Sequence, residues 1–520
     1  MLLDDKTAGV VAESVLRLRD EQNENRDIDA HRAREIYANK TAPILPLSMS
    51  DKLRQEYQIE WTPPAIAKCC VDKIMAAMYG RIVQREVGEK AEAGAELTDD
   101  QITVNKLLES WDRSTARAYT RCLIHGHVVI RFFPDHRTGT VMGLYDPDEA
   151  TPLYDPTTED LTPYGIVYHY STPSTGFPIP VRPGDVHILE YITAHKRDAV
   201  TGEILSAGKR LRWYSLDKDT WHPWPYFAGD AGLNPYGDHL GAVVWRNDDV
   251  EGADGTSEVL PIYNLLMALA HTTTDLKLLL KWNVFPILAS NSPGFSDVPY
   301  SWRQNIELEP DAASNKGEIT RVDWNPNSLT AGMDFLRLLL QLTNESTCVP
   351  AIAMGDLSDI GNLSSGRALE IVMMPLTDLT NRRQKLQAWQ EEQAIREMLV
   401  VWSHMLYENK KGDPFKLMTE TYEGNAYPSA FMLPINVTFG PLGLARSTED
   451  LVNYTTQLYG AGLASLDYCL RTIHPDWTDD QIIEELDRVK GESQPREGNV
   501  VDEGRTARIQ AMIGGQTDAE

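Results

Sequence analysis

The sequence predicts an α+β protein in which a β-rich region is followed by long helices. Three observations support this prediction. Residues 1–125 carry apolar residues at helical spacing, residues 127–250 contain short β-branched and aromatic runs, and helical spacing returns after residue 256. Turns rich in Pro, Gly and Asp separate the strand-like runs, and helices do not. The sheets are therefore expected to be antiparallel, without a doubly wound nucleotide-binding fold.

The first 125 residues are expected to form amphipathic helices. Mixed charges over Asp27–Asn39 indicate one helix, and the pair Pro63-Pro64 opens a second, whose apolar residues recur every three or four positions. A third apolar run covers Val104–Ile124.

The next region is expected to form short strands joined by hairpins. Each candidate is rich in Val, Ile, Tyr, Phe or Trp and ends at a turn residue. The expected strands are His127–Phe133, Val141–Tyr145, Ile166–Tyr170, Val186–Ile192 and Leu211–Leu216.

Two helices separated by a compact excursion are expected next. Pro261–Trp282 is predicted to be one helix of roughly 33 Å, with proline in its first turn. A segment rich in Pro, Asn, Ser and Asp follows, with short strand-like pieces at Asn305–Leu308 and Glu318–Val322. A second helix is predicted over Leu329–Thr347.

A mixed apolar and acidic loop over residues 348–363 leads from this second helix into a much longer one. The long helix is expected from Ala368 to about Tyr407, with a bend where Pro375 lacks a backbone donor. Ser364 or Ser365 suits its N-cap, and Gly366 follows.

The last third is expected to add one strand and a small helical region. Leu433–Gly440 is predicted to form the strand. Ser447–Asp450 and Thr478–Gln481 both match the capping-box pattern that starts a helix.

Composition limits the partners of the chain. The formal charge of −27 disfavours tight DNA binding through a basic patch. The apolar run Val259–Trp282 contains charged residues and is too polar to span a bilayer, so no membrane is expected. Five cysteines without a regular spacing indicate reduced, mostly buried thiols. The acidic start Met1–Lys6 is unlike a signal peptide.

The order helix, loop, Ser-Gly-Arg-Ala-Leu (residues 365–369) and long helix resembles the tunnel-loop region of tailed double-stranded DNA bacteriophage portal proteins. These proteins form the head-to-tail connector ring through which DNA enters and leaves the capsid. The resemblance covers roughly residues 30–492, because the elements before and after the motif follow the same order. It implies a portal-type fold, with a mixed α/β wing, a two-helix stem, a small clip, a long wing helix and an α-helical crown.

The resemblance also implies a division of the chain into parts. These are an N-terminal segment with the first part of the wing (1–255), stem helix 1 (256–282), the clip (283–328), stem helix 2 (329–347), the tunnel loop (348–363), the long wing helix with the rest of the wing (364–446), the crown (447–492) and a flexible C-terminal tail (493–520).

Site residues follow from the same resemblance. The tunnel loop would project towards DNA with the residues Met354, Asp356, Leu357, Asp359, Ile360 and Asn362. The first stem helix would present Asp275, Lys277 and Lys281 to the channel. Whether these lysines contact DNA or are ordinary solvated positions is left open by the sequence.

A portal protein is expected to work without catalytic residues, a cofactor or a metal site of its own. The resemblance implies a homo-oligomeric ring, usually a dodecamer, with double-stranded DNA in its channel. Its implied protein partners are the terminase large subunit, which docks on the clip, a head-completion or adaptor protein that replaces it, and the major capsid and scaffolding proteins. The implied location is the portal vertex of the virion, after assembly in the host cytoplasm.

Two alternatives remain. A metal-dependent nuclease, or another phage DNA-processing enzyme, would use scattered ligands such as Asp146, Asp148 and His127, although solvated acids in a turn are the default interpretation of the two aspartates. Another head–tail connector or a minor capsid protein would share the ring but would not bind terminase through residues 283–328.

Overall fold

The computed structural model describes most of the predicted helices and strands. The described residues are 5–22, 26–40, 63–80, 83–87, 102, 104–105, 108, 111–135, 139–155, 162–173, 185–197, 201, 203–224, 232–248, 255–284, 287–290, 305–307, 319–322, 326–355, 366–408, 419–422, 425–428, 435–440, 452, 455–457, 459–460, 465–474 and 479–493. The chain divides into two compact units, Met1–Leu442 and Gly443–Glu520.

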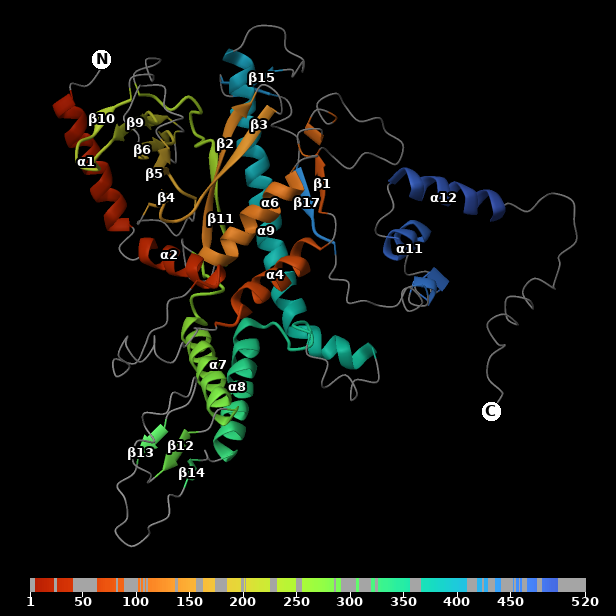
Figure 1. Cartoon of the computed structure of the whole chain (residues 1–520). Helices are drawn as coiled ribbons and strands as arrows, with labels where there is room; N and C mark the ends of the chain where they lie inside the picture. The colour runs from red at the N-terminus through yellow and green to blue at the C-terminus, as the bar shows by residue number, and fades with distance from the viewer. Residues whose placement is uncertain are drawn as a thin grey trace, which may run out of the picture. The chain divides into compact units, whose positions relative to one another are not determined.

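The first unit mixes helices with sheets that are antiparallel apart from one pair of strands, β12 with β13, which confirms the predicted α+β class (Figure 1). Its N-terminal helices are α1 (Asp5–Gln22), α2 (Arg26–Tyr37), α4 (Ile66–Tyr79) and α6 (Trp111–His125). Each of the three helices predicted between residues 27 and 124 is present.

Two sheets form the centre of this unit. A three-stranded sheet has the order β11-β2-β3, and a five-stranded sheet has the order β10-β9-β6-β5-β4. The strands are β2 (His127–Asp135), β3 (Gly139–Tyr145), β4 (Ala150–Leu153), β5 (Gly165–Pro173), β6 (Asp185–Thr193), β9 (Arg210–Ser215), β10 (His222–Pro223) and β11 (Ala242–Arg246). All their pairings are antiparallel.

The five strands predicted between residues 127 and 216 are confirmed as β2, β3, β5, β6 and β9. The sequence analysis did not single out β4 and β11, although every residue of both strands is buried. Strands buried on both faces lack the apolar–polar alternation by which strands are usually recognised. Smaller pairs complete the unit: β7 (Lys196–Arg197) with β8 (Ile204–Ser206), β1 (Gln84–Val87) with β17 (Ile435–Thr438), and β15 (Thr419–Tyr422) with β16 (Asn425–Pro428). β17 lies inside the predicted strand Leu433–Gly440.

Alternate residues of the same strands reach two different cores. On β2, Val128 and Ile130 pack in the large core with the helices, whereas Val129 packs against the five-stranded sheet. On β11, Trp245 faces the helices and Val244 faces the other sheet. The three-stranded sheet therefore lies between a helical layer and the five-stranded sheet.

The outer face of the five-stranded sheet is covered by α1. Ala12 and Val15 of this helix pack with Leu189, Trp213 and Trp221 in a third cluster. The unit therefore has four layers: helices, two sheets and the N-terminal helix.

A buried ion cluster joins the two sheets. Arg131 on β2 donates two hydrogen bonds, of 2.9 and 2.8 Å, to Glu190 on β6, and Arg210 donates a third at 3.0 Å. Burial alone would raise the pKa of Glu190, but the arginines outweigh it and lower this pKa to about 2. The carboxylate therefore stays charged between the sheets at neutral pH.

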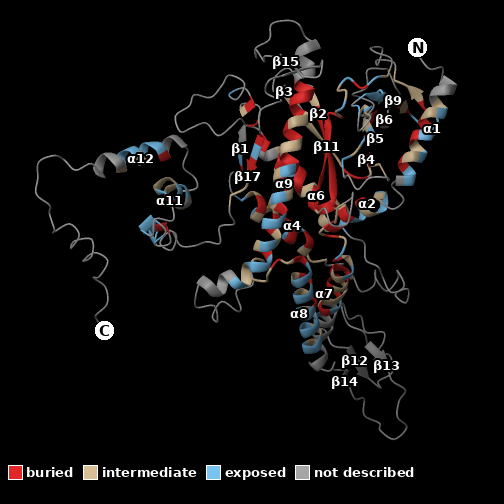
Figure 2. Ribbon diagram, turned by 180° about the vertical axis from the view of Figure 1, so that it is seen from behind, coloured by how far each residue is buried: buried red, intermediate tan, exposed pale blue. Residues whose placement is uncertain are grey.

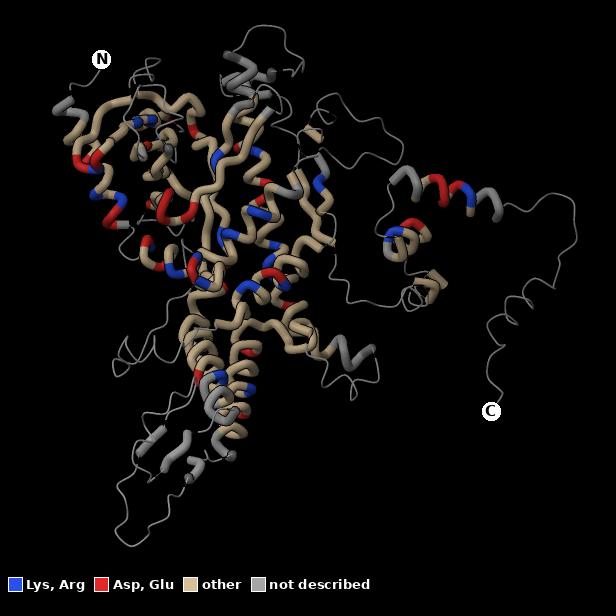
Figure 3. Tube along the Cα trace, in the orientation of Figure 1, with Lys and Arg blue, Asp and Glu red and all other residues tan. Residues whose placement is uncertain are grey.

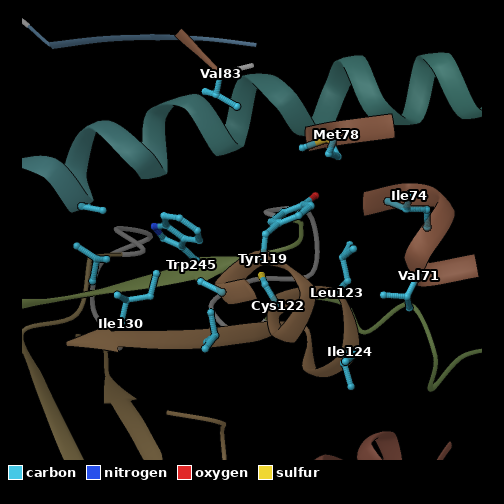
Figure 4. Packing of buried hydrophobic residues seen from close by; sticks show 14 of the residues in the cluster. Val71, Ile74, Met78, Val83, Tyr119, Cys122, Leu123, Ile124, Ile130 and Trp245 are labelled. Atoms are coloured by element: carbon cyan, nitrogen blue, oxygen red, sulfur yellow. The ribbon is translucent and has the colours of Figure 1, made fainter. Parts of the chain in front are cut away.

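The long helix α9 (Gly366–Glu408) lies along the helical side of the three-stranded sheet (Figure 1). The long helix predicted from Ala368 to about Tyr407 is therefore confirmed. Figure 4 shows this helix above Trp245 of β11 and Tyr119 of α6. Buried residues concentrate on the part of α9 that covers the sheet (Figure 2). The helix changes direction near its N-terminal end, where Pro375 lies within it.

One side chain of α9 takes the place of a missing strand beside β11. The Gln390 amide accepts a hydrogen bond from Arg246 N at 3.0 Å and donates one to Arg246 O at 3.0 Å. The backbone carbonyl of Gln390 accepts a hydrogen bond from Trp245 Nε1 at 3.1 Å. The backbone groups of Arg246 on the outer edge of β11 are thereby paired by a helix side chain.

A second polar contact holds α9 to the loop before β11. Glu397 accepts a hydrogen bond from Gly241 N at 2.9 Å and lies 2.7 Å from His239 Nδ1. Burial alone would lower the pKa of His239, but the hydrogen bond and the charge of Glu397 outweigh it, so this pKa lies above its ordinary value.

The second unit contains α11 (Leu466–Ile473) and α12 (Asp479–Ser493), which pack on each other. Ser465 caps α11 by accepting a bond from Tyr468 N at 3.2 Å. α12 begins directly after Thr478, at the position that the second capping box predicts. Ser447–Asp450, Thr478 and the tail 493–520 lie outside the described residues, apart from Ser493.

Replacing Gln390 with Met should destabilise the protein while keeping the side-chain volume. Two buried backbone groups of Arg246 would lose their partner, and each such loss costs about 1–3 kcal/mol. We expect the free energy of unfolding in a urea titration to fall by about 2–4 kcal/mol. The control Gln384→Met removes a long 3.4 Å bond to Gly440 O and should cost less than about 1 kcal/mol. Equal losses in both variants would contradict this account.

The His239–Glu397 contact should make stability depend on pH near neutrality. Because the folded state raises the pKa of His239, the stabilisation is complete below its ordinary pKa and disappears as pH rises through the folded value. Thermal melts from pH 6 upwards should show a decline for the wild type and a flatter profile for Glu397→Gln. Parallel profiles would show that this pair does not control the slope.

Candidate functional site: a helical hairpin and the loop that follows it

Two long helices leave the sheet region and return to it as a hairpin (Figure 1). They are α7 (Tyr263–Val284) and α8 (Pro326–Thr347), and they pack side by side. Gly332 on α8 permits a close approach to Leu276 on α7, because a Cβ at residue 332 would lie 2.6 Å from Leu276 Cδ2. The predicted pair of helices is therefore confirmed.

Both helix starts differ from the prediction. The first helix was predicted to begin at Pro261, within a stem part that starts at residue 256, but α7 begins at Tyr263. Ser257 explains the difference, because its hydroxyl accepts hydrogen bonds from Val259 N and Leu260 N at 3.2 Å and so forms a local turn. Conversely, α8 begins at Pro326, earlier than the predicted Leu329, because proline is favoured in a first helical turn.

Threonine hydroxyls inside the hairpin bond to their own helix. Thr274 donates to Ala270 O at 2.7 Å, and Thr343 donates to Leu339 O at 2.8 Å. Both side chains are buried. Since their hydroxyls have these partners, both threonines are buried without an unsatisfied hydroxyl.

The outer side of α8 carries an exposed apolar stripe. Phe335, Leu338 and Leu342 lie one or two turns apart on one face and are 49%, 49% and 39% exposed. The sequence shows more leucines on this helix than one buried face can hold, and this excess is the signal from which the stripe could have been predicted. The neighbouring helices carry further exposed apolar residues, namely Leu280 on α7 and Ile371 and Met374 on α9.

The hairpin is electrically balanced, unlike the chain as a whole. Its charged residues are Asp275, Lys277, Lys281, Asp334, Arg337 and Glu345, three of each sign. Figure 3 shows few coloured positions along α7 and α8. Of the residues expected to line a channel, Asp275 is exposed and Lys277 is half-buried, while the side chain of Lys281 lies outside the described residues.

The predicted loop begins as a compact turn. Cys348 ends α8 with a positive φ of 55°, and the next residue, Val349, is fully buried. Met354 N donates to Ala351 O at 3.0 Å, and the half-buried Met354 side chain packs against the large core. Gly355 follows with φ 96°. The other expected loop residues, Asp356, Leu357, Asp359, Ile360 and Asn362, lie outside the described residues.

The long helix begins next to the predicted cap. Gly366 is its first residue, which places Ser365 at the N-cap position in the sequence. Ser364 and Ser365 themselves lie outside the described residues.

The segment between α7 and α8 forms a small sheet. Its strands are β12 (Ile287–Ser290), β13 (Asn305–Glu307) and β14 (Ile319–Val322). β12 is central, parallel to β13 and antiparallel to β14. The two strand-like pieces predicted here are thus confirmed, and β12 is additional.

The nuclease candidates occupy ion pairs. Asp146 is buried and lies within 3.5 Å of Arg34 Nη1, 3.3 Å of Arg121 Nη1 and 3.5 Å of His125 Nε2. Asp148 pairs with Arg34 as well. Burial, and next Arg34, lower the pKa of His125 to about 4, so it is neutral at pH 7. Arginines therefore occupy the carboxylates that a catalytic metal would need.

The third nuclease candidate, His127, lies on a different element from His125. Gly126, with φ 91°, separates α6 from β2, so His127 starts the strand whereas His125 ends the helix. Across the described ranges, no group of three or more His, Cys, Asp or Glu side chains is arranged to hold a metal ion.

Among the residues that the structure describes, no helix has the length and apolar character needed to cross a bilayer.

All five cysteines are free thiols, and Cys70, Cys122 and Cys469 are buried, as predicted.

No protein-family model matches this chain, and no curated protein matches it at a significant level.

Replacing Asp146 with Ala should lower stability and leave DNA intact. Arg34 and Arg121 would lose a buried acceptor, which should cost about 1–3 kcal/mol. Asp29 provides the control, because its side chain is 46% exposed and pairs with Arg32 at the surface. Asp29→Ala should cost less than about 1 kcal/mol. We expect no Mg²⁺-dependent cleavage of plasmid DNA from any of these proteins. Cleavage by the wild type that Asp146→Ala abolishes would instead establish the nuclease.

Proposed function

We propose that this chain is a portal protein of a tailed double-stranded DNA bacteriophage, a ring-forming channel for DNA packaging and ejection. In this proposal α7 and α8 are the stem, β12–β14 belong to the clip, and residues 348–363 form the tunnel loop. The layered sheets with α9 are the wing, and α11 and α12 belong to the crown.

The order of the elements carries the proposal. A β-rich region leads into α7, a small sheet follows, α8 returns, and a loop precedes a helix of 43 residues that covers the first sheet. A hairpin of two 22-residue helices is about 33 Å long. Copies of this hairpin could form the channel wall between the proposed wing and the proposed clip.

The apolar stripe on α8 supports assembly into a ring. Phe335, Leu338 and Leu342 lie on one face of α8 and are exposed in the single chain. A contact between this face and a different face of a neighbouring copy is heterologous, and repeated heterologous contacts close into a ring when the rotation is right. Burying the stripe in this way removes apolar area from water at about 25 cal/mol per Å².

The charge distribution supports passage of DNA without strong binding. A stem with three acidic and three basic residues offers no strong field to phosphate, and the chain as a whole is acidic. Each phosphate contact made by a lysine or arginine would release counterions and strengthen binding. Weak binding lets DNA slide, which a conduit needs and a repressor avoids.

The proposed partners follow from the parts of the ring. The terminase large subunit would dock on the clip during packaging and supply the ATPase, and a head-completion or adaptor protein would take its place afterwards. Major capsid and scaffolding proteins would surround the ring at the capsid vertex. The protein would therefore assemble in the host cytoplasm and remain in the virion, without catalysis, cofactor or metal of its own.

The test is assembly and its dependence on the stripe. Native mass and negative-stain images of the purified wild type, with scaffold present, should show a ring of about a dozen copies with a central hole. Leu338→Asp should leave monomers, because a charge would be buried in each stem contact.

Met333 provides a matched control for the Leu338 variant. It is 41% exposed and lies about 140° round the helix from Leu338. Met333→Asp should therefore retain rings. A wild type that stays monomeric or dimeric with scaffold present would overturn the proposed function, and rings in Leu338→Asp would overturn the role of the stripe.

A further inference from the structure

The segment between β11 and α7 is anchored to the end of α6. Ser257 Oγ donates to Ile124 O, and Glu258 N donates to Leu123 O at 2.8 Å. Asn247, directly after β11, donates from its backbone to Gly126 O at 2.8 Å. The root of the hairpin is therefore fixed to the body of the first unit by two backbone hydrogen bonds and one from the Ser257 hydroxyl on the α6 side.

Side chains fix the same root to α9. The carboxylate of Glu258 accepts a bond from Asn247 Nδ2 at 2.6 Å and pairs with Arg383 of α9. The side chains of Glu258 and Arg383 are only 13% and 8% exposed. Asn247 Nδ2 also donates to Thr256 O at 2.9 Å, which closes the loop before the hairpin.

Other described contacts between the hairpin and the body include apolar packing, the guanidinium of Arg32 at 5.4 Å from the ring centre of Tyr263, and a 3.8 Å contact between Cys70 Sγ and Thr347 Oγ1. Leu266 and Leu269 of α7 and Leu339 of α8 belong to the large core. Apolar contacts are non-directional, so they hold the hairpin against the body but tolerate small rotations. A buried, hydrogen-bonded ion pair has a defined geometry and resists such rotations.

We propose that Arg383 and Glu258 are positioning residues that fix the angle of the hairpin to the body and thereby set the number of subunits in the ring. This inference rests on the proposed function. Rings of twelve and thirteen copies differ by only about 2° of rotation at each contact, so a small change in angle is enough to alter the number. In the proposed ring a neighbouring copy would contact both the hairpin and the body, so their relative angle would set the rotation from one copy to the next.

The first test is the distribution of subunit numbers measured by native mass spectrometry. Wild-type rings should have one number, and Arg383→Met should give a mixture of numbers. The adjacent Arg382 is the matched control, because it is exposed and pairs with Asp248 at the surface. Arg382→Met should keep the wild-type number. Rings of one unchanged number in Arg383→Met would overturn the inference.

Rescue separates positioning from a general loss of stability. The charge-reversed double variant Glu258→Arg with Arg383→Glu should restore a single ring number, because it restores a pair of opposite charges. A mixture that persists in the double variant, with melting temperature recovered, would overturn the positioning role.

A second measurement does not require rings. Spin labels on the native exposed Cys69 of α4 and on Met333→Cys of α8, in a Cys348→Ser background, report the angle between body and hairpin. Pulsed electron resonance on monomers should give a broader distance distribution when Arg383→Met is added, and an unchanged one with Arg382→Met. Failure of the wild type to form rings would refute the proposed function and with it the effect on ring number, whereas equal distance distributions would refute the claim that Arg383 and Glu258 fix the hairpin angle.

Discussion

The contact between α9 and β11 is the constraint on which the rest of the first unit depends. β11 is an edge strand with every residue buried, so its outward backbone groups need partners that water does not provide. Gln390 supplies both partners for Arg246 through one amide. This contact fixes the register of α9 on the sheet, and other polar residues of the helix then reach their own partners, as Glu391 does with Tyr79 and Arg85 at 2.8 Å.

The same helix connects the sheet region to the hairpin. Arg383 lies two turns before Gln390 and reaches Glu258 at the hairpin root, and Glu397 lies two turns after it and holds the loop before β11. A single rigid element therefore positions the sheet, the loop and the hairpin relative to one another. Long helices are well suited to this because their side chains recur at fixed intervals of about 5.4 Å per turn.

The hairpin carries apolar side chains that the single chain leaves exposed. Its inner face is packed, with Gly332 allowing close approach of the two helices, but the stripe of Phe335, Leu338 and Leu342 is exposed. Exposed apolar residues at regular helical spacing mark an interaction surface more strongly than scattered ones do. The proposed ring gives this surface a partner of the same chain, and the balanced charge of the stem suits a surface that meets both protein and DNA.

The sequence by itself determined the order of the elements, because periodicity and turn residues are local signals. It predicted α7, α8, α9 and most of the strands, and the reduced cysteines. Only the tertiary structure decided which polar residues meet. Asp146 was a candidate metal ligand until Arg34 and Arg121, far from it in the chain, were found to pair with it. Similarly, no local pattern distinguishes Arg383, which is buried on Glu258, from the exposed Arg382 beside it. Long-range pairing depends on how distant segments pack, and a linear pattern holds no record of that packing.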